Sequence, residues 1–187
     1  MRFQYADYWD IHHRKSTRLP NRNYAADGMY FVTICTIERE CLLGKILNGK
    51  MILNEFGRFA EAALTWIPKQ YTYVKLDAHV VMPNHVHAIL CLSDEGHCED
   101  AARRGGSRTA PTTTHIPSRP RKSLGRLVGV FKTVSTKWIN VMRDAPGEPI
   151  WQRNYHDRII RNADELYRVR QYIAENPQKW SEKDMAV

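Results

Sequence analysis

Two histidines in the segment His85-Val86-His87 are spaced so that their imidazoles can share one chemical task. The pair lies in an apolar run, residues 76–92, that is rich in leucine and valine and is interrupted by Pro83. On a β-strand, successive side chains point to opposite faces, so His85 and His87 project from the same side. Two neighbouring imidazoles on a strand can supply two ligands to one divalent metal ion. The sequence therefore predicts half of a metal site at this position.

A tyrosine and an asparagine near the end of the sequence could complete such a site. Tyr172 and Asn176 are four residues apart in a segment with a helical pattern, so they lie on one helix face, one turn from each other. A phenol beside a metal-bound phosphate can act as a nucleophile, and an amide oxygen can coordinate the same hard cation. Tyr155 and Tyr167 are the alternative nucleophiles, Tyr155 because a histidine and an aspartate follow it. The partnership with Asn176 favours Tyr172.

The segments that must position these residues alternate between strand and helix patterns. Runs of β-branched and aromatic residues predict strands over 29–37, 74–82, 85–92 and 150–160, with a short hairpin over 41–53. Apolar residues at helical spacing predict helices from the N-cap Asn54 to about residue 70, from the N-cap Ser123 to about residue 143, and from Asp164 to about Glu175. Pro177 is expected to end the last helix after Asn176. The order predicts an α+β fold, a mainly antiparallel sheet with helices packed on it.

Composition changes along the chain divide it into four parts. Residues 1–27 are polar, aromatic and basic and predict an N-terminal arm, and residues 28–180 carry the domain. Within the domain, residues 93–122 consist mainly of glycine, serine, threonine, proline and arginine, which predicts a long, disordered basic insertion. Residues 181–187 are a C-terminal tail.

The charge balance points to a polyanionic partner. The 187 residues include 28 Lys+Arg and 20 Asp+Glu, for a net charge of +8, which favours nucleic acid. Candidate phosphate contacts lie in the arm, on the helix after the insertion and in the following strand: Arg14, Lys15, Arg18, Lys132, Lys137, Arg158 and Arg161.

Other sequence features bear on the cellular setting. The first residues contain no apolar signal-peptide core, and no apolar run reaches the roughly 18 residues of a spanning helix. The four cysteines show no Cys-x-x-Cys spacing, which argues against a structural zinc site, and reduced thiols suit a cytoplasm. We expect a cytoplasmic protein without membrane attachment.

Several of these motifs occur together in one known family. The sequence resembles the REP-associated tyrosine transposases, relatives of the single-tyrosine transposases of simple insertion sequences within the HUH endonuclease group. The resemblance covers roughly residues 28–180, in the family's order. It rests on Tyr30-Phe-Val-Thr-Ile-Cys-Thr36, Val80-Val-Met-Pro-Asn-His-Val-His87, Leu124-Gly, Phe131-Lys132, Trp151-Gln152, Asp157-Arg158-Ile-Ile-Arg161 and Tyr172-Ile-x-x-Asn-Pro177.

The resemblance implies a ferredoxin-like catalytic domain that cuts single-stranded DNA, usually at a hairpin, with Mg²⁺ or Mn²⁺. By the family pattern Tyr172 is the nucleophile and forms a 5′-phosphotyrosine link. His85 and His87 match the metal-binding pair, and Asn176 matches the polar residue that completes the metal site. Such proteins act as monomers or homodimers. Two alternatives stay open, a domesticated protein that binds hairpin DNA without cutting it, and a metal phosphodiesterase that activates water.

Overall fold

The computed structural model describes residues 23–93 and 121–180 of the chain. The predictions for the arm up to residue 22, for most of the basic insertion and for the tail lie outside the described residues. The expected DNA contacts Arg14, Lys15 and Arg18 are among them. The described residues include the histidine pair and the last predicted helix.

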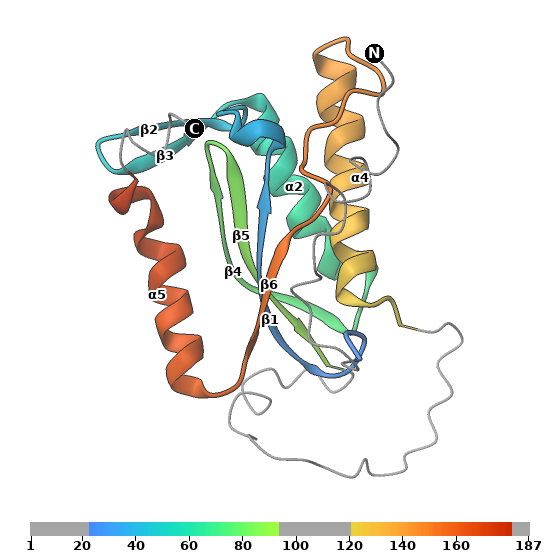
Figure 1. The fold of residues 1–187 in the computed structure, drawn as a ribbon, viewed down its shortest axis with the longest axis vertical. Coiled ribbons are helices and arrows are strands. Elements are labelled where there is room, and N and C mark those ends of the chain that lie inside the picture. The colour runs from blue at the N-terminus through green and yellow to red at the C-terminus, as the bar shows by residue number, and fades with distance from the viewer. Residues whose placement is uncertain (1–22, 94–120, 181–187) are drawn as a thin grey trace, which may run out of the picture.

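Four strands form one antiparallel sheet in the spatial order β4-β5-β1-β6 (Figure 1). The strands are β1 (Gly28–Cys35), β4 (Val74–Met82), β5 (His85–Leu92) and β6 (His156–Ile160). Helix α2 (Glu55–Gln70) precedes β4, and helix α4 (Leu124–Met142) precedes β6. The main elements therefore follow the β-α-β-β-α-β order of a ferredoxin-like fold. The predicted α+β class with a mainly antiparallel sheet is confirmed.

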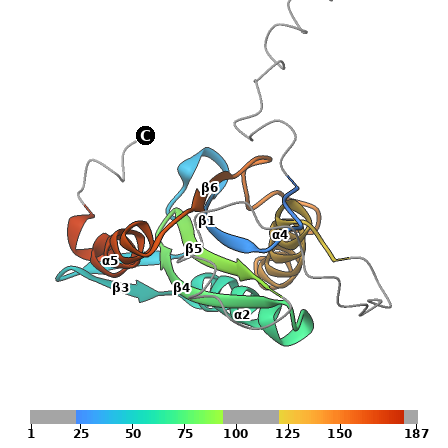
Figure 2. The ribbon, with the colours of Figure 1, turned by 90° about the horizontal axis from the view of Figure 1, so that it is seen from below.

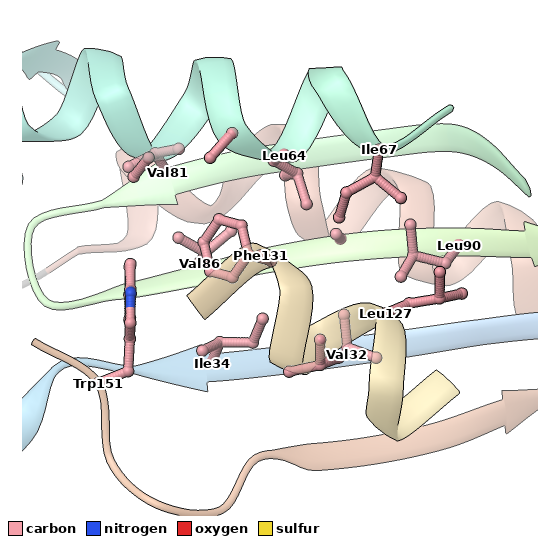
Figure 3. Packing of buried hydrophobic residues seen from close by; sticks show 14 of the residues in the cluster. Val32, Ile34, Leu64, Ile67, Val81, Val86, Leu90, Leu127, Phe131 and Trp151 are labelled. Atoms are coloured by element: carbon pink, nitrogen blue, oxygen red, sulfur yellow. The ribbon is translucent and has the colours of Figure 1, made fainter. Parts of the chain in front are cut away.

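The two faces of the sheet carry separate hydrophobic clusters. Alternate side chains such as Val32 and Val86 join the larger cluster, which packs beneath α2 and α4 around Phe131 (Figure 3). The intervening residues face the other way, where Ile89 packs against Ile173 of the last helix. That helix is α5 (Ala163–Lys179), which lies apart from α2 and α4 across the sheet (Figure 2). Period-two alternation thus assigns one face to the core and the other to α5.

A small hairpin lies beside the end of α5. Strands β2 (Gly44–Leu47) and β3 (Lys50–Leu53) pair antiparallel, as the sequence predicted, and a short 3-10 helix η1 (Ile37–Arg39) precedes them. The turn residues Asn48 and Gly49 have φ angles of 50° and 70°, the left-handed values that a tight hairpin turn requires. Gly49 lies against the side chain of Gln178, so the hairpin contacts the C-terminal end of α5.

The N-caps of α2 and α4 allow a matched stability test. Asn54 Oδ1 accepts a hydrogen bond of 2.9 Å from the Gly57 amide, whereas the Ser123 side chain makes no capping hydrogen bond. We expect Asn54→Ala to lower the free energy of unfolding by about 1 kcal/mol, because it leaves a helix amide unsatisfied. Ser123→Ala is the control and should be nearly neutral in the same urea titration. Equal losses in the two variants would contradict the assignment of the cap.

Two predicted boundaries are wrong. The strand predicted over 150–160 is regular only in β6. The residues before β6 make single hydrogen bonds instead of a ladder: Ile150 with the Ile37 amide and Gln152 with the Cys35 carbonyl. The carbonyls of residues 152–154 accept hydrogen bonds from the Lys132 side chain. Helix α5 does not end before Pro177 but continues to Lys179. A proline in the last turn removes one intrahelical hydrogen bond, and α5 tolerates that loss so near its end.

Two findings bear on the expected cellular setting. Cys35 and Cys41 are free thiols, but Cys91 is disulfide-bonded, so the expectation of reduced thiols is wrong at Cys91. Across residues 23–93 and 121–180, no helix combines the length and apolar character needed to cross a bilayer.

Candidate active site

The turn between β4 and β5 fixes the position of the histidine pair. The carbonyl of Pro83 accepts a hydrogen bond from the Leu43 amide, and the carbonyl of Asn84 accepts bonds from both the amide and the hydroxyl of Thr36. Thr36 is completely buried and Asn84 nearly so. This turn, predicted from Pro83, therefore holds the start of β5 rigidly beside the end of β1.

The two imidazoles meet on the face of the sheet that α5 covers. His85 Nε2 lies 3.1 Å from His87 Nε2. Each outer nitrogen has a polar partner, since His85 Nδ1 lies 2.7 Å from Asn84 Oδ1 and His87 Nδ1 lies 2.9 Å from the hydroxyl of Thr33. Both rings are buried. Burial, reinforced by the nearby His85, lowers the pKa of His87 from 6.5 to about 3, so this imidazole is neutral at pH 7, the form that binds metals.

Helix α5 brings the predicted nucleophile to the same point. Tyr172 Oη lies 3.3 Å from His87 Nε2, and the two rings are 5.2 Å apart. Phe31 of β1 stacks on His87 and contacts the Tyr172 ring edge to face. The tyrosine nevertheless remains 44% exposed, so an incoming phosphate can reach it. The contact between the phenol and the imidazole, predicted from positions 85 residues apart, forms within a single chain.

The donor set fits a divalent cation between the imidazoles. An amide oxygen only accepts, so His85 Nδ1 carries the proton and the lone pair of Nε2 points toward His87. The two Nε2 atoms, 3.1 Å apart, are the nitrogens that would hold a divalent cation. If both Nε2 atoms held a cation, His87 would lose the proton on Nε2 and carry one on Nδ1, which would then donate to the Thr33 hydroxyl. Outer partners of this kind orient the ligands of metal sites.

The third predicted ligand is less closely engaged. Asn176 is half-buried on α5, one turn beyond Tyr172, and its side chain makes no hydrogen bond to any residue in the described parts of the chain. Within those parts, no third histidine, cysteine, aspartate or glutamate joins the imidazoles to form a metal-binding group. A further side-chain ligand close to the imidazoles among the described residues would therefore be an amide or phenol oxygen, and the role of Asn176 stays a prediction.

The four predicted DNA contacts in the described residues have different surroundings. Lys132 donates hydrogen bonds of 2.6–3.3 Å to three successive carbonyls, those of residues 152–154, and burial lowers its pKa to about 8. Lys137 is exposed on α4. Arg158 is exposed on β6 but pairs with Glu165 at 2.7 Å, and Arg161 is exposed just before α5. Their contacts with DNA stay predictions, and Lys132 already has a structural role.

Four residues beside the site were not predicted. They are Phe31, Thr33, Asn84 and Trp180, whose ring centre lies 5.8 Å from that of His85. A sequence signal existed for Thr33, because alternation on the predicted strand places it on the same face as Phe31. Trp180 lies beyond Pro177, where the sequence predicts that the helix has already ended.

The hydroxyl of Thr33 provides a test of the metal site. We expect Thr33→Val, which keeps the shape of the side chain, to weaken Mn²⁺ binding about 10- to 100-fold because His87 loses its outer partner. Calorimetric titration with Mn²⁺ measures the change. Thr133→Val is the control, since among the described residues that hydroxyl bonds only the carbonyl of Gly129 in its own helix. Unchanged Mn²⁺ affinity in Thr33→Val would show that this hydroxyl does not orient a ligand.

Comparison with solved structures defines the class of fold. A REP-associated tyrosine transposase bound to a REP hairpin aligns with a TM-score of 0.56 and 18% identity, over 89% of this chain and 77% of that one. A transposase candidate from Deinococcus radiodurans R1 aligns with a TM-score of 0.46 and 17% identity, over 88% of this chain and all of the other. The chain has the α+β fold of the REP-associated transposase.

A sequence comparison places the chain in a family. It is 33% identical over 180 residues to an uncharacterized protein of Haemophilus influenzae, covering 95% of each chain. The chain therefore belongs to the same family as this Haemophilus protein. No family model matches the sequence.

Proposed function

We propose that this protein is a metal-dependent HUH-type tyrosine nuclease that cuts and rejoins single-stranded DNA next to a hairpin. The observation that carries the proposal is the contact of Tyr172 Oη with His87 Nε2 at 3.3 Å, in a pair of facing imidazoles. A nucleophilic phenol beside a metal-binding pair, exposed on one side, is the arrangement that phosphodiester attack requires. The net charge of +8 and the fold shared with a hairpin-bound transposase support DNA as the substrate.

The chemistry conserves one phosphodiester. The phenol oxygen of Tyr172 attacks the phosphorus in line with the bond to the 3′ oxygen, and its proton passes to solvent or to a neighbouring base. The bond between phosphorus and the 3′ oxygen breaks, and that oxygen takes up a proton from solvent, which leaves a 3′-hydroxyl on one strand and a 5′-phosphotyrosine on the other. A second 3′-hydroxyl can then reverse the reaction and join a new strand without an external energy source.

A divalent ion, Mg²⁺ or Mn²⁺, would be held by His85 and His87, with Asn176 as the expected oxygen ligand. When bound, it would neutralise charge on the phosphate and help orient that group for in-line attack. The chain itself contributes a rigid strand that presents both imidazoles, and a helix that presents the phenol beside them. Since one chain supplies both parts, a monomer is sufficient for this site, although a homodimer is compatible with it.

A gel assay separates this proposal from its two alternatives. The protein is incubated with end-labelled single-stranded hairpin DNA and Mn²⁺, then denatured and resolved. A labelled band at the mass of a protein–DNA adduct supports the tyrosine mechanism. Cleavage without an adduct supports a phosphodiesterase that activates water, and hairpin binding without cleavage supports a non-catalytic binding protein. Either of those two results would overturn the proposal.

A further inference from the structure

A β-bulge in the edge strand β4 places two consecutive residues, Asp77 and Ala78, on the face of the sheet that α5 covers. The pairing of β4 with β5 shifts register between Leu76 and His79. Leu76 packs with the cluster beneath α2 and α4, whereas Ala78 packs with the cluster on the α5 face. Asp77 follows Leu76 in regular alternation and so faces α5, where it meets Arg170, and the extra residue places Ala78 on the same face. A bulge has this effect, because one extra residue puts two consecutive side chains on the same side.

Asp77 accepts two parallel hydrogen bonds from Arg170 of α5. Arg170 Nε donates to Asp77 Oδ2 at 2.8 Å, and a terminal nitrogen of the same guanidinium donates to Asp77 Oδ1 at 2.5 Å. The carboxylate side chain is 15% exposed and the arginine side chain 40%. A bidentate arginine–carboxylate pair fixes direction as well as distance, which a single ion pair between flexible side chains does not.

The ion pair of Asp77 with Arg170 lies on the side of α5 opposite Tyr172. Leu166, Val169 and Ile173 form the stripe that packs on the sheet. At 100° per residue, Arg170 lies on one side of this stripe and Tyr172 on the other, because two positions on a helix are about 200° apart. The ion pair that joins Arg170 to Asp77 of β4 therefore fixes the rotation of α5 about its own axis. That rotation decides how far the phenol reaches toward His87.

The other ion pairs of α5 among the described residues do not connect its middle to the sheet. The Tyr172 side chain is substantially exposed, so packing surrounds it on one side only. The pair of Arg158 with Glu165 fixes the start of α5, and the pair of Lys179 with Glu175 lies within the helix itself. Among the described residues, the ion pair of Asp77 with Arg170 connects the sheet to the middle of α5. Arg170 is two residues before Tyr172 in the sequence.

We propose that Asp77 and Arg170 form a positioning clamp that holds Tyr172 in line for attack, an inference that rests on the proposed function. Both are positioning residues, since they act through α5 and do not touch the imidazoles. A displacement of about 1 Å at a reacting group can cost about 100-fold in rate. We therefore expect loss of the clamp to slow adduct formation while DNA remains bound.

A double-mutant cycle measures the effect on rate. Asp77→Asn, Arg170→Gln and the double variant are mixed with excess hairpin DNA and Mn²⁺, and the single-turnover rate of adduct formation is followed. We expect each single variant to be about 10- to 100-fold slower, with the double variant no slower than either, because the residues act only through each other. Asp77→Asn also removes a negative charge, so its DNA affinity should not fall, which separates positioning from binding. Lys179→Gln, which breaks an ion pair that does not reach the sheet, is the control and should keep the wild-type rate.

A second readout does not depend on activity. 3-Fluorotyrosine is placed at position 172, and its ¹⁹F resonance reports the packing of the ring against His87 and Phe31. We expect the resonance to move toward the unfolded-state value in Asp77→Asn and to stay in place in Lys179→Gln. If Asp77→Asn does not fold, Arg170→Lys serves instead, because it keeps the charge and loses the paired donors. A moved resonance supports the clamp whether or not the wild-type protein forms an adduct. Failure of the wild-type protein to form an adduct would overturn only the proposed function. A resonance that stays in place, or losses that add in the double variant, would overturn the clamp.

Discussion

Replacing Tyr172 with phenylalanine is expected to abolish the covalent protein–DNA adduct, with a loss of at least about 1000-fold in single-turnover cleavage. The variant loses only the hydroxyl whose oxygen lies 3.3 Å from His87 Nε2, so no nucleophile remains while the ring keeps its contact with Phe31. The measurement is the denaturing gel with labelled hairpin DNA and Mn²⁺.

Tyr167→Phe is the matched control for this variant. Tyr167 lies on the same helix and is 62% exposed, and its hydroxyl accepts a hydrogen bond only from Gln171 among the described residues. Adduct formation should stay at the wild-type level in this control, and hairpin affinity should be unchanged in both variants. An adduct that persists in Tyr172→Phe and disappears in Tyr155→Phe would assign the nucleophile to the other candidate tyrosine.

Replacing His87 with alanine is expected to abolish cutting and to leave hairpin binding largely intact. This imidazole is the centre of the site, within hydrogen-bond distance of His85, Thr33 and Tyr172. Loss of an outer partner of a metal ligand already costs about 10- to 100-fold, so loss of the ligand itself should cost more than about 100-fold in cleavage. Cleavage and hairpin affinity are measured side by side at saturating Mn²⁺.

His79→Ala provides the control for the histidine substitution. His79 lies on the adjacent strand but faces α2, where its ring is 3.7 Å from Glu61. The His79→Ala variant should cleave hairpin DNA as fast as the wild-type protein does. Equal cleavage by His87→Ala and the wild-type protein would refute the metal site. If hairpin binding and cleavage fell by the same factor, His87 would instead contribute to DNA binding.

Local sequence signals predicted the elements that have a local cause. Asn54 begins a helix because its side chain replaces a missing backbone partner, and Pro83 divides two strands because it cannot donate to the ladder. The same-side placement of His85 and His87 follows from the period of a strand, and the approach of Tyr172 was expected from the family resemblance. Apart from the approach of Tyr172, these predictions needed no knowledge of distant contacts.

The features that the sequence does not predict depend on contacts between distant residues. Asp77 and Arg170 are 93 positions apart, and no local pattern in the sequence predicts the register shift between Leu76 and His79. Lys132 was expected to face DNA, yet three carbonyls converge on its ammonium group because the segment before β6 lies against α4. Pro177 predicts the end of a helix, but its place in the last turn lets α5 continue up to Trp180, whose ring then reaches His85.

Because α5 buries its apolar stripe in a cluster separate from the main core, the two halves of the site differ in how easily they open. The histidines belong to a strand covered on its far side by α2 and α4, and the tyrosine belongs to a helix held by a few side chains. Amide hydrogens of α5 should therefore exchange with solvent faster than those of β5, through partial unfolding that leaves the rest of the domain intact. Such partial unfolding would move Tyr172, the proposed nucleophile, away from the histidines while the rest of the domain stays folded.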